Sequence, residues 1–147
     1  MKPIKLHILL AEDSGVEMLV YRSLLTRLAT DQSSEIRQRY LPECGEVEIA
    51  LSYTCAVHPN QALECIRNEG ARFDAVLSDG IGWLDFATEA ATRFPVIGST
   101  GDEEMVSAFQ KVGITCYLKG GNDSTGEKDI AQVCANVIRA GLRLPIQ

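Results

Sequence analysis

Residues 73–79 read FDAVLSD, a short and largely apolar run that ends in the acidic residue Asp79. A run of this length predicts a strand that is buried on both faces of a sheet. Residues 4–11 (IKLHILLA) have the same character and are followed at once by two acids, Glu12 and Asp13. Two buried strands that end in carboxylates indicate a parallel sheet whose acidic strand ends lie along one edge.

Apolar strand runs and amphipathic helical stretches alternate along the rest of the chain. Three further strands are predicted, at residues 47–53, 95–99 and 115–118. Helical spacing of apolar residues predicts five helices, at residues 15–30, 60–68, 84–93, 102–112 and 129–142. This alternation predicts an α/β fold in which helices cover both faces of a five-stranded parallel sheet.

Two segments depart from this alternation. Residues 31–46 are polar and contain the breakers Pro42 and Gly45, so we interpret them as an extension of the preceding helix followed by a loop. The stretch GGNDSTG at 120–126 predicts a flexible loop. Because no internal repeat or linker is visible, we expect residues 1–147 to form a single domain with no output domain.

Composition excludes several classes of function. The chain of 147 residues has 14 basic and 20 acidic side chains, a formal net charge of −6, and its basic residues are scattered singly. Direct nucleic-acid binding is therefore not expected, since it requires a basic patch. No apolar run approaches the roughly 20 residues that span a bilayer, so we expect a cytoplasmic protein without membrane insertion. The five widely spaced cysteines indicate reduced thiols rather than a disulfide framework or a zinc site.

The predicted strand ends carry polar residues that would lie at the same edge of the sheet. In chain order these residues are Glu12 and Asp13, Thr54, Asp79, Thr100 and Lys119. Carboxylates that are packed together raise the pKa of one another, and a divalent cation relieves that repulsion. Oxygen ligands suit Mg²⁺, which takes one or two protein carboxylates and keeps several waters. The sequence therefore predicts a magnesium site flanked by an ammonium group.

This ordered set resembles the receiver domain of two-component response regulators over nearly the whole chain. AED at 11–13 resembles the family's acidic pair, and AVLSD at 75–79 resembles the strand that presents the phosphoacceptor aspartate. PVIGSTG at 95–101 resembles the strand with the switch hydroxyl, and YLKGG at 117–121 resembles the lysine segment. The resemblance implies a divergent stand-alone receiver with a flavodoxin-like three-layer (βα)5 sandwich and strand order 2-1-3-4-5.

The resemblance also implies roles for individual acids. Asp79 would accept a phosphoryl group from a sensor histidine kinase or a histidine phosphotransfer protein. Asp13, Asp79 and the backbone carbonyl of Ile81 would bind Mg²⁺ directly, and Glu12 would act through water. Phosphoryl transfer of this kind depends mainly on positioning and charge neutralisation.

Two further residues would contact the phosphoryl group. Lys119 would pair with its oxygens, and Thr100 would hydrogen-bond to them after its loop moves inward. Phosphorylation would shift the population of surface conformations and so change binding to a downstream protein target. Beyond weak Mg²⁺-dependent autophosphorylation and autodephosphorylation, we do not expect an enzyme.

Several positions depart from the family's pattern. The loop after Asp79 reads GIGWLDF in place of Met-Pro and Asp-Gly, and only sixteen positions separate Asp79 from Pro95, so the intervening helix must be short. Gly120 follows the lysine where the family has proline. Tyr117 lies two residues before Lys119 rather than three, which puts it on the lysine's face of the sheet or requires a bulge.

These departures leave alternatives open. The chain could be a receiver-like interaction module that no longer cycles phosphate. A flavodoxin-like carrier of a flavin or nucleotide is a third possibility, although the carboxylates of the AEDSG loop would repel a bare phosphate. Glu12 and Asp13 could simply stabilise a helix N-terminus, Thr100 could cap the next helix, and Lys119 could be a solvated strand end. Trp83 could be a surface anchor or fill the space beside the short helix.

Overall fold

The computed structural model describes residues 2–119 and 126–147, with residues 126–129 described by their backbone only. Residues 120–125 of the predicted loop therefore lie outside the described residues, and so does Gly120, the residue found where the family has proline. In the described part of the chain, no helix is both long and apolar enough to cross a membrane.

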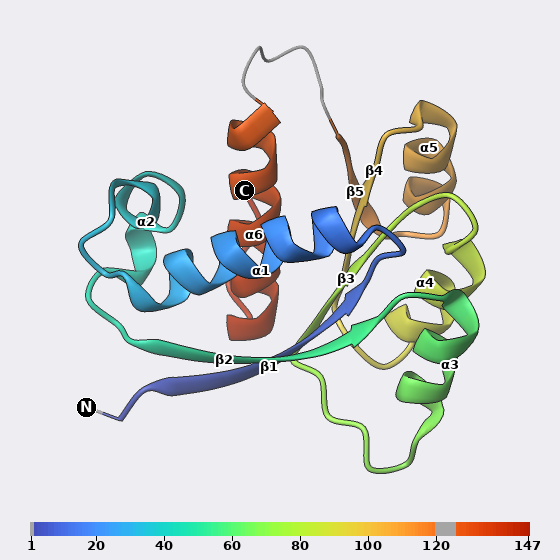
Figure 1. Cartoon of the computed structure of the whole chain (residues 1–147), viewed down its shortest axis with the longest axis horizontal. Coiled ribbons are helices and arrows are strands. Elements are labelled where there is room, and N and C mark those ends of the chain that lie inside the picture. The colour runs from blue at the N-terminus through green and yellow to red at the C-terminus, as the bar shows by residue number, and fades with distance from the viewer. Residues whose placement is uncertain (1, 120–125) are drawn as a thin grey trace.

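Within these residues, five parallel strands form one sheet in the order β2-β1-β3-β4-β5 (Figure 1). They are β1 (Ile4–Ala11), β2 (Ile49–Ala56), β3 (Ala75–Ser78), β4 (Val96–Thr100) and β5 (Thr115–Leu118). The predicted fold class and strand order are confirmed. The predicted bounds of β2, residues 47–53, lie a few residues too early, since this edge strand pairs with β1 from Ile49 to Ala56.

The helices described in the structure lie on both faces of the sheet. They are α1 (Gly15–Thr30), α2 (Glu35–Tyr40), α3 (Pro59–Arg67), α4 (Leu84–Ala91), α5 (Glu103–Lys111) and α6 (Gly126–Leu142), with a 3₁₀ turn, η1, at Pro42–Cys44. Figure 1 shows α1, α2 and α6 on one face and α3, α4 and α5 on the other, which gives three layers. The helix α4 is short, as the spacing between Asp79 and Pro95 predicted.

Two apolar cores separate these layers, because successive strand side chains point to opposite faces. In β1, Ile8 packs on the side of α1 and α6, whereas Leu9 packs on the side of α3, α4 and α5. Trp83 is only 1% exposed and packs edge-to-face on Phe86, at 5.7 Å between ring centroids. Of the two interpretations of Trp83, the structure therefore supports the one in which it fills the core.

Two apolar side chains at helical spacing from buried residues are exposed. Leu24 and Leu28 of α1 are buried, but Val20, one turn before Leu24, is 38% exposed. The buried face of α1 is instead completed by Tyr21 and Leu25. Val112 is 46% exposed because α5 ends at the preceding residue.

The interpretation of residues 31–46 as an extension of α1 was wrong. The helix α1 ends at Thr30, and Ser34 begins a separate helix, α2, by accepting a hydrogen bond from the Arg37 N–H at 3.0 Å. The Arg37 side chain is 1% exposed and donates to the carbonyls of Leu28 and Ala29, at 3.1 and 3.0 Å, and to that of Val47. A buried cation at the C-terminal end of α1 satisfies its last carbonyls and thereby fixes α2 against α1.

A chain of polar contacts joins β5 to α6 and to η1. Asn136 is fully buried and donates a hydrogen bond to the Tyr117 hydroxyl. Its side-chain oxygen accepts from Arg139 at 2.9 Å, and Arg139 forms two hydrogen bonds with Glu43, at 2.8 and 3.0 Å. These bonds hold the pKa of Glu43 below its ordinary value. Tyr117 thus lies on the α6 face of a regular β5 strand.

Candidate functional site

The strand pairing fixes where the acidic residues begin. The N–H of Glu12 donates to the carbonyl of Ala56 at 3.0 Å, and that of Asp79 donates to the carbonyl of Ala11 at 2.8 Å. Sheet hydrogen bonding therefore continues one residue beyond β1 and β3, so the segments that follow these two strands leave the sheet side by side. As a result, carboxylate oxygens of Glu12, Asp13 and Asp79 lie within 4.8 Å of one another. We call these three residues the acidic cluster.

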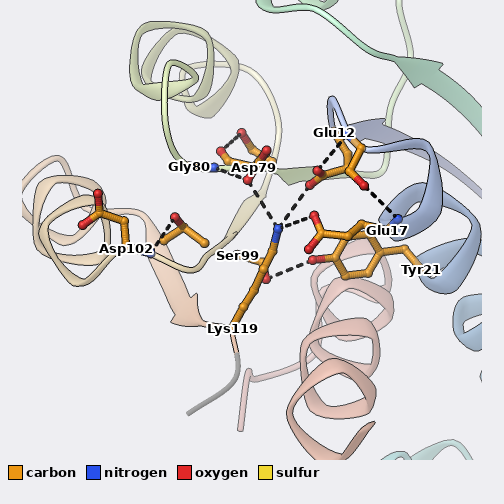
Figure 2. A network of polar contacts seen from close by, with 11 residues as sticks. Glu12, Glu17, Tyr21, Asp79, Gly80, Ser99, Asp102 and Lys119 are labelled. Atoms are coloured by element: carbon orange, nitrogen blue, oxygen red, sulfur yellow. Dashed lines mark hydrogen bonds and ion pairs between the residues drawn. The ribbon is translucent and has the colours of Figure 1, made fainter. Parts of the chain in front are cut away.

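Lys119 lies against this cluster from the end of β5. Its backbone N–H donates to the carbonyl of Thr100 at 2.7 Å, which extends the pairing of β4 with β5. Its Nζ lies 3.4 Å from an oxygen of Glu12 and 3.4 Å from an oxygen of Asp79. A closer partner, at 2.8 Å, is Glu17 of α1. Figure 2 shows the amine pointing toward these three side chains.

Burial and crowding shift the pKa values at the site. Burial, together with a hydrogen bond shared with Glu17, raises the pKa of Glu12 to about 8, despite the opposing attraction of Lys119. Burial also raises the pKa of Asp79, with a further contribution from Asp13. Burial alone would lower the pKa of Lys119, but the surrounding acidic groups raise it above its ordinary value. The site thus disfavours additional negative charge and retains a protonated amine.

Two residues of α1 belong to this site and were not identified from the sequence. The Glu17 N–H donates to the Ser14 hydroxyl at 3.3 Å, so the capped first turn presents its carboxylate to Lys119. One turn later, the Tyr21 hydroxyl donates to Ser99 at 3.1 Å, and its ring centre lies 5.9 Å from the Lys119 amine. Burial raises the pKa of Tyr21 to about 12, so the phenol stays neutral. The available signal was the four-residue spacing between Glu17 and Tyr21, which puts both side chains on one face of α1.

Thr100 lies beside Asp79 in a closely packed arrangement. Its side chain is 1% exposed, and its Oγ1 accepts from the Asp102 N–H at 3.2 Å. The Gly80 N–H donates to Asp79 Oδ1 at 2.8 Å, and a Cβ built on Gly80 would lie 2.3 Å from both Cβ and Oγ1 of Thr100. Thr100 therefore supports the first turn of α5 and also packs directly against the residue that follows Asp79.

Gly80→Ala is expected to destabilise the protein by about 2 kcal/mol, because the new methyl group would overlap the buried Thr100 side chain. Urea unfolding measures this loss. Gly101→Ala is a matched control, since nothing lies within 4 Å of a Cβ at that position. Equal unfolding midpoints for the two variants would contradict the close packing of Gly80 on Thr100.

Thr54 does not lie at the site, contrary to the prediction. The strand β2 continues beyond it, and its Oγ1 is hydrogen-bonded to Nε2 of His7 at 2.7 Å. Together with Phe73, these residues line a separate open groove of about 520 Å³. The error follows from the position of β2 at the sheet edge, where polar side chains interrupt the apolar pattern.

The residues present fit a divalent cation. The acidic cluster offers hard oxygen ligands, which Mg²⁺ prefers, and among the described residues one ammonium, that of Lys119, contacts three carboxyl groups. Ile81 lies in the turn after Asp79, where the Trp83 N–H donates to the carbonyl of Gly80 at 3.0 Å, and its side chain is 66% exposed. The ligand role of the Ile81 carbonyl stays a prediction.

Of the two alternatives for Tyr117, the register of β5 supports the first: Tyr117 and Lys119 lie on the same face, without a bulge. The position three residues before the lysine is occupied by Cys116, which is buried on the other face of the sheet. There it packs beside Gly98, where a Cβ would lie 2.8 Å from the Cys116 sulfur and 2.5 Å from the ring of Phe109. A small residue in β4 and a thiol in β5 thus fill the space around Phe109.

Comparison with solved structures identifies the fold. The phosphorylated cyanobacterial phytochrome response regulator RcpA superposes with a TM-score of 0.62 at 15% identity, with 94% of each chain covered. A response regulator solved in its Mn²⁺-bound form gives a TM-score of 0.58 at 19% identity, over 91% of this chain and 92% of that one.

A third similar structure is the receiver domain of a sensor histidine kinase from Pseudomonas aeruginosa PAO1, with magnesium coordinated in its active-site cleft. Its TM-score is 0.54 at 20% identity, over 89% of this chain and 98% of that domain. No protein-family model and no curated protein matches the sequence. The strand order, the three layers and these superpositions together show that the chain has the fold of response-regulator receiver domains.

Proposed function

We propose that this protein is a phosphoacceptor domain of a two-component or phosphorelay system, in which Asp79 is phosphorylated in the presence of Mg²⁺ and thereby changes partner binding. The observation that carries the proposal is the position of the Lys119 amine, 3.4 Å from Asp79 at the edge of the acidic cluster. The likeness to receiver domains, two of them solved with a divalent cation, supports it.

The residues would divide the chemistry as follows. Glu12, Asp13, Asp79 and the carbonyl of Ile81 would hold the ion, which supplies positive charge that neutralises the transferring phosphoryl group. An oxygen of Asp79 forms a bond to phosphorus while the bond between phosphorus and the donor histidine nitrogen breaks. The electron pair of that bond stays with the leaving imidazole.

Two residues would steady the phosphoryl group once it is attached. The ammonium of Lys119 donates to its oxygens, because the amine already lies within reach of Asp79. The Thr100 hydroxyl would donate a further hydrogen bond from its buried position against Gly80. The chemistry of the protein itself would be limited to slow Mg²⁺-dependent gain and loss of the phosphoryl group.

The outer face of α1 offers a docking surface for a histidine kinase or a histidine phosphotransfer protein. Val16 and Leu19 are 74% and 66% exposed and lie in the first two turns of α1, shortly after Asp13. With Ile130 of α6, Leu19 lines a shallow apolar groove of about 440 Å³. A phosphodonor that buries this face would present its histidine to the acidic cluster.

We further propose a cytoplasmic location, because the five cysteines are free thiols.

Incubation of the wild-type protein with acetyl phosphate and Mg²⁺ is expected to add one phosphoryl group, and removal of Mg²⁺ with EDTA is expected to prevent it. The physical reason is that the carboxylates of the cluster repel the anionic donor unless a cation neutralises them. Intact-mass spectrometry measures the adduct. A protein that takes no phosphoryl group and binds no beryllofluoride in Mg²⁺ would contradict the proposal.

That negative outcome would favour the second candidate, a receiver-like interaction module without phosphate cycling. The observation in its favour is the arrangement of β5. The hydroxyl of Tyr117 is engaged by Asn136 on the α6 face, and the position where the family resemblance expects the aromatic residue holds the buried Cys116. Any effect of phosphorylation on the protein surface would therefore need a route other than an aromatic side chain at that position.

A further inference from the structure

Among the residues that the structure describes, the shortest contact of the Lys119 amine is with Glu17, a residue outside the acidic cluster. The distance from Nζ to the Glu17 carboxylate is 2.8 Å, against 3.4 Å to Asp79 and to Glu12. Glu17 comes from α1 rather than from a strand end, and its side chain is 42% exposed, whereas that of Asp79 is 15% exposed. The amine is therefore held most closely by a carboxylate that the proposed phosphoryl chemistry does not use.

We propose that Glu17 restrains the Lys119 amine in the unphosphorylated protein, and that a phosphoryl group on Asp79 must compete with Glu17 for this amine. Glu17 is then a positioning residue that sets how readily Asp79 is phosphorylated. This inference rests on the proposed function and adds a regulatory element to the same site.

The geometry supports a competition between the two anions. An ammonium group has three N–H donors, and here they are shared among Glu17, Glu12 and Asp79. The amine sits above the Tyr21 ring, and the backbone of Lys119 is fixed by its bond to Thr100, so the side chain pivots about a fixed base. A phosphoryl group on Asp79 adds strong acceptors on one side of this pivot, and Glu17 draws the amine to the other side.

The charge of Glu17 acts in the same direction as its contact. An incoming phosphoryl group is anionic, and a carboxylate beside the amine opposes its approach. The same charge favours a cation at the acidic cluster. Removal of the Glu17 charge is therefore expected to strengthen anion binding at the site while weakening binding of Mg²⁺, two effects of opposite sign.

The test compares Glu17→Gln with Glu35→Gln in the full chain. Both residues lie in the first turn of a helix, and each variant loses one negative charge, but Glu35 belongs to α2 and is exposed. With Mg²⁺ saturating, Glu17→Gln is expected to bind beryllofluoride about 3- to 10-fold more tightly than wild type and to react correspondingly faster with acetyl phosphate. A Mg²⁺ titration of the same variant is expected to give weaker binding, and Glu35→Gln is expected to match wild type in all three measurements.

The outcomes separate this inference from the proposed function. If all three proteins are phosphorylated and Glu17→Gln equals wild type or Glu35→Gln, the restraint by Glu17 is refuted while the phosphoacceptor role stands. If wild type and both variants all fail to take up beryllofluoride or a phosphoryl group, the proposed function fails and the inference fails with it. Thermal unfolding of each variant verifies that a changed affinity does not come from a changed fold.

Discussion

Asp79→Asn is expected to abolish the phosphoryl adduct that wild type forms with acetyl phosphate and Mg²⁺. The amide cannot form an acyl phosphate, although its side-chain oxygen can still accept the Gly80 N–H, which donates to Asp79 at 2.8 Å. Burial holds the pKa of Asp79 above its ordinary value, so its ionised form costs the folded state free energy at neutral pH. The neutral amide is therefore expected to leave the melting temperature unchanged or to raise it. Intact mass and thermal unfolding measure the two effects.

Asp85→Asn provides the matched control for this variant. Asp85 lies six residues further on, in the first turn of α4, and its side chain is exposed. The Asp85→Asn variant is expected to take up one phosphoryl group at the wild-type rate. A full adduct on Asp79→Asn would assign the phosphoryl group to another residue and remove Asp79 from its proposed role. A lowered melting temperature of Asp79→Asn would show instead that the carboxylate supports the fold.

Arg37→Met is expected to cost about 3 kcal/mol of unfolding free energy, more than Gly80→Ala. The thioether fills much of the space of the arginine stem but cannot donate to the carbonyls of Leu28, Ala29 and Val47. Part of the cost is offset, because the Arg37 Nε is buried without a hydrogen-bond partner among the described residues. Denaturant unfolding measures the loss, and hydrogen exchange is expected to speed up first in α2.

The control for this substitution lies two residues away in the same helix. Arg39 is exposed, and its guanidinium lies over the ring of Tyr40 at 5.6 Å. Arg39→Met is expected to change the unfolding free energy by less than about 0.5 kcal/mol. Equal losses for the two variants would mean that helix propensity, and not the buried contacts of Arg37, governs this segment.

The strands were predictable because buried parallel strands combine a continuous apolar run with a polar residue at the carboxyl end. For β1, β3 and β5 this pattern places Glu12, Asp79 and Lys119 within a residue of the strand ends, where the structure brings them together. The register of the sheet then brings these residues together, since parallel strands that end at the same level place their last side chains at one edge. The interpretation of Thr54 failed at the sheet edge, where one face of β2 is less buried.

Contacts that depend on where the helices pack were not predictable in this way. A correct prediction for residues 31–46 would have required that Arg37 be fully buried, and arginine is rarely buried without partners. The partners of Arg37 are backbone carbonyls, which leave no trace in the sequence. From the sequence alone, Glu17 is simply an acid in the first turn of a helix, where it suits the helix dipole. Its contact with Lys119, 102 positions away, depends on how α1 is placed over the sheet.

The buried polar contacts from Tyr117 through Asn136 and Arg139 to Glu43 have a consequence for descent. Replacement of one of these residues leaves polar atoms of its partner buried without a hydrogen bond. A single substitution therefore costs more stability than a matched pair of substitutions. In related sequences, substitutions at these positions of β5, α6 and η1 are therefore expected to be correlated, so that a change at one position is accompanied by a change at its hydrogen-bond partner.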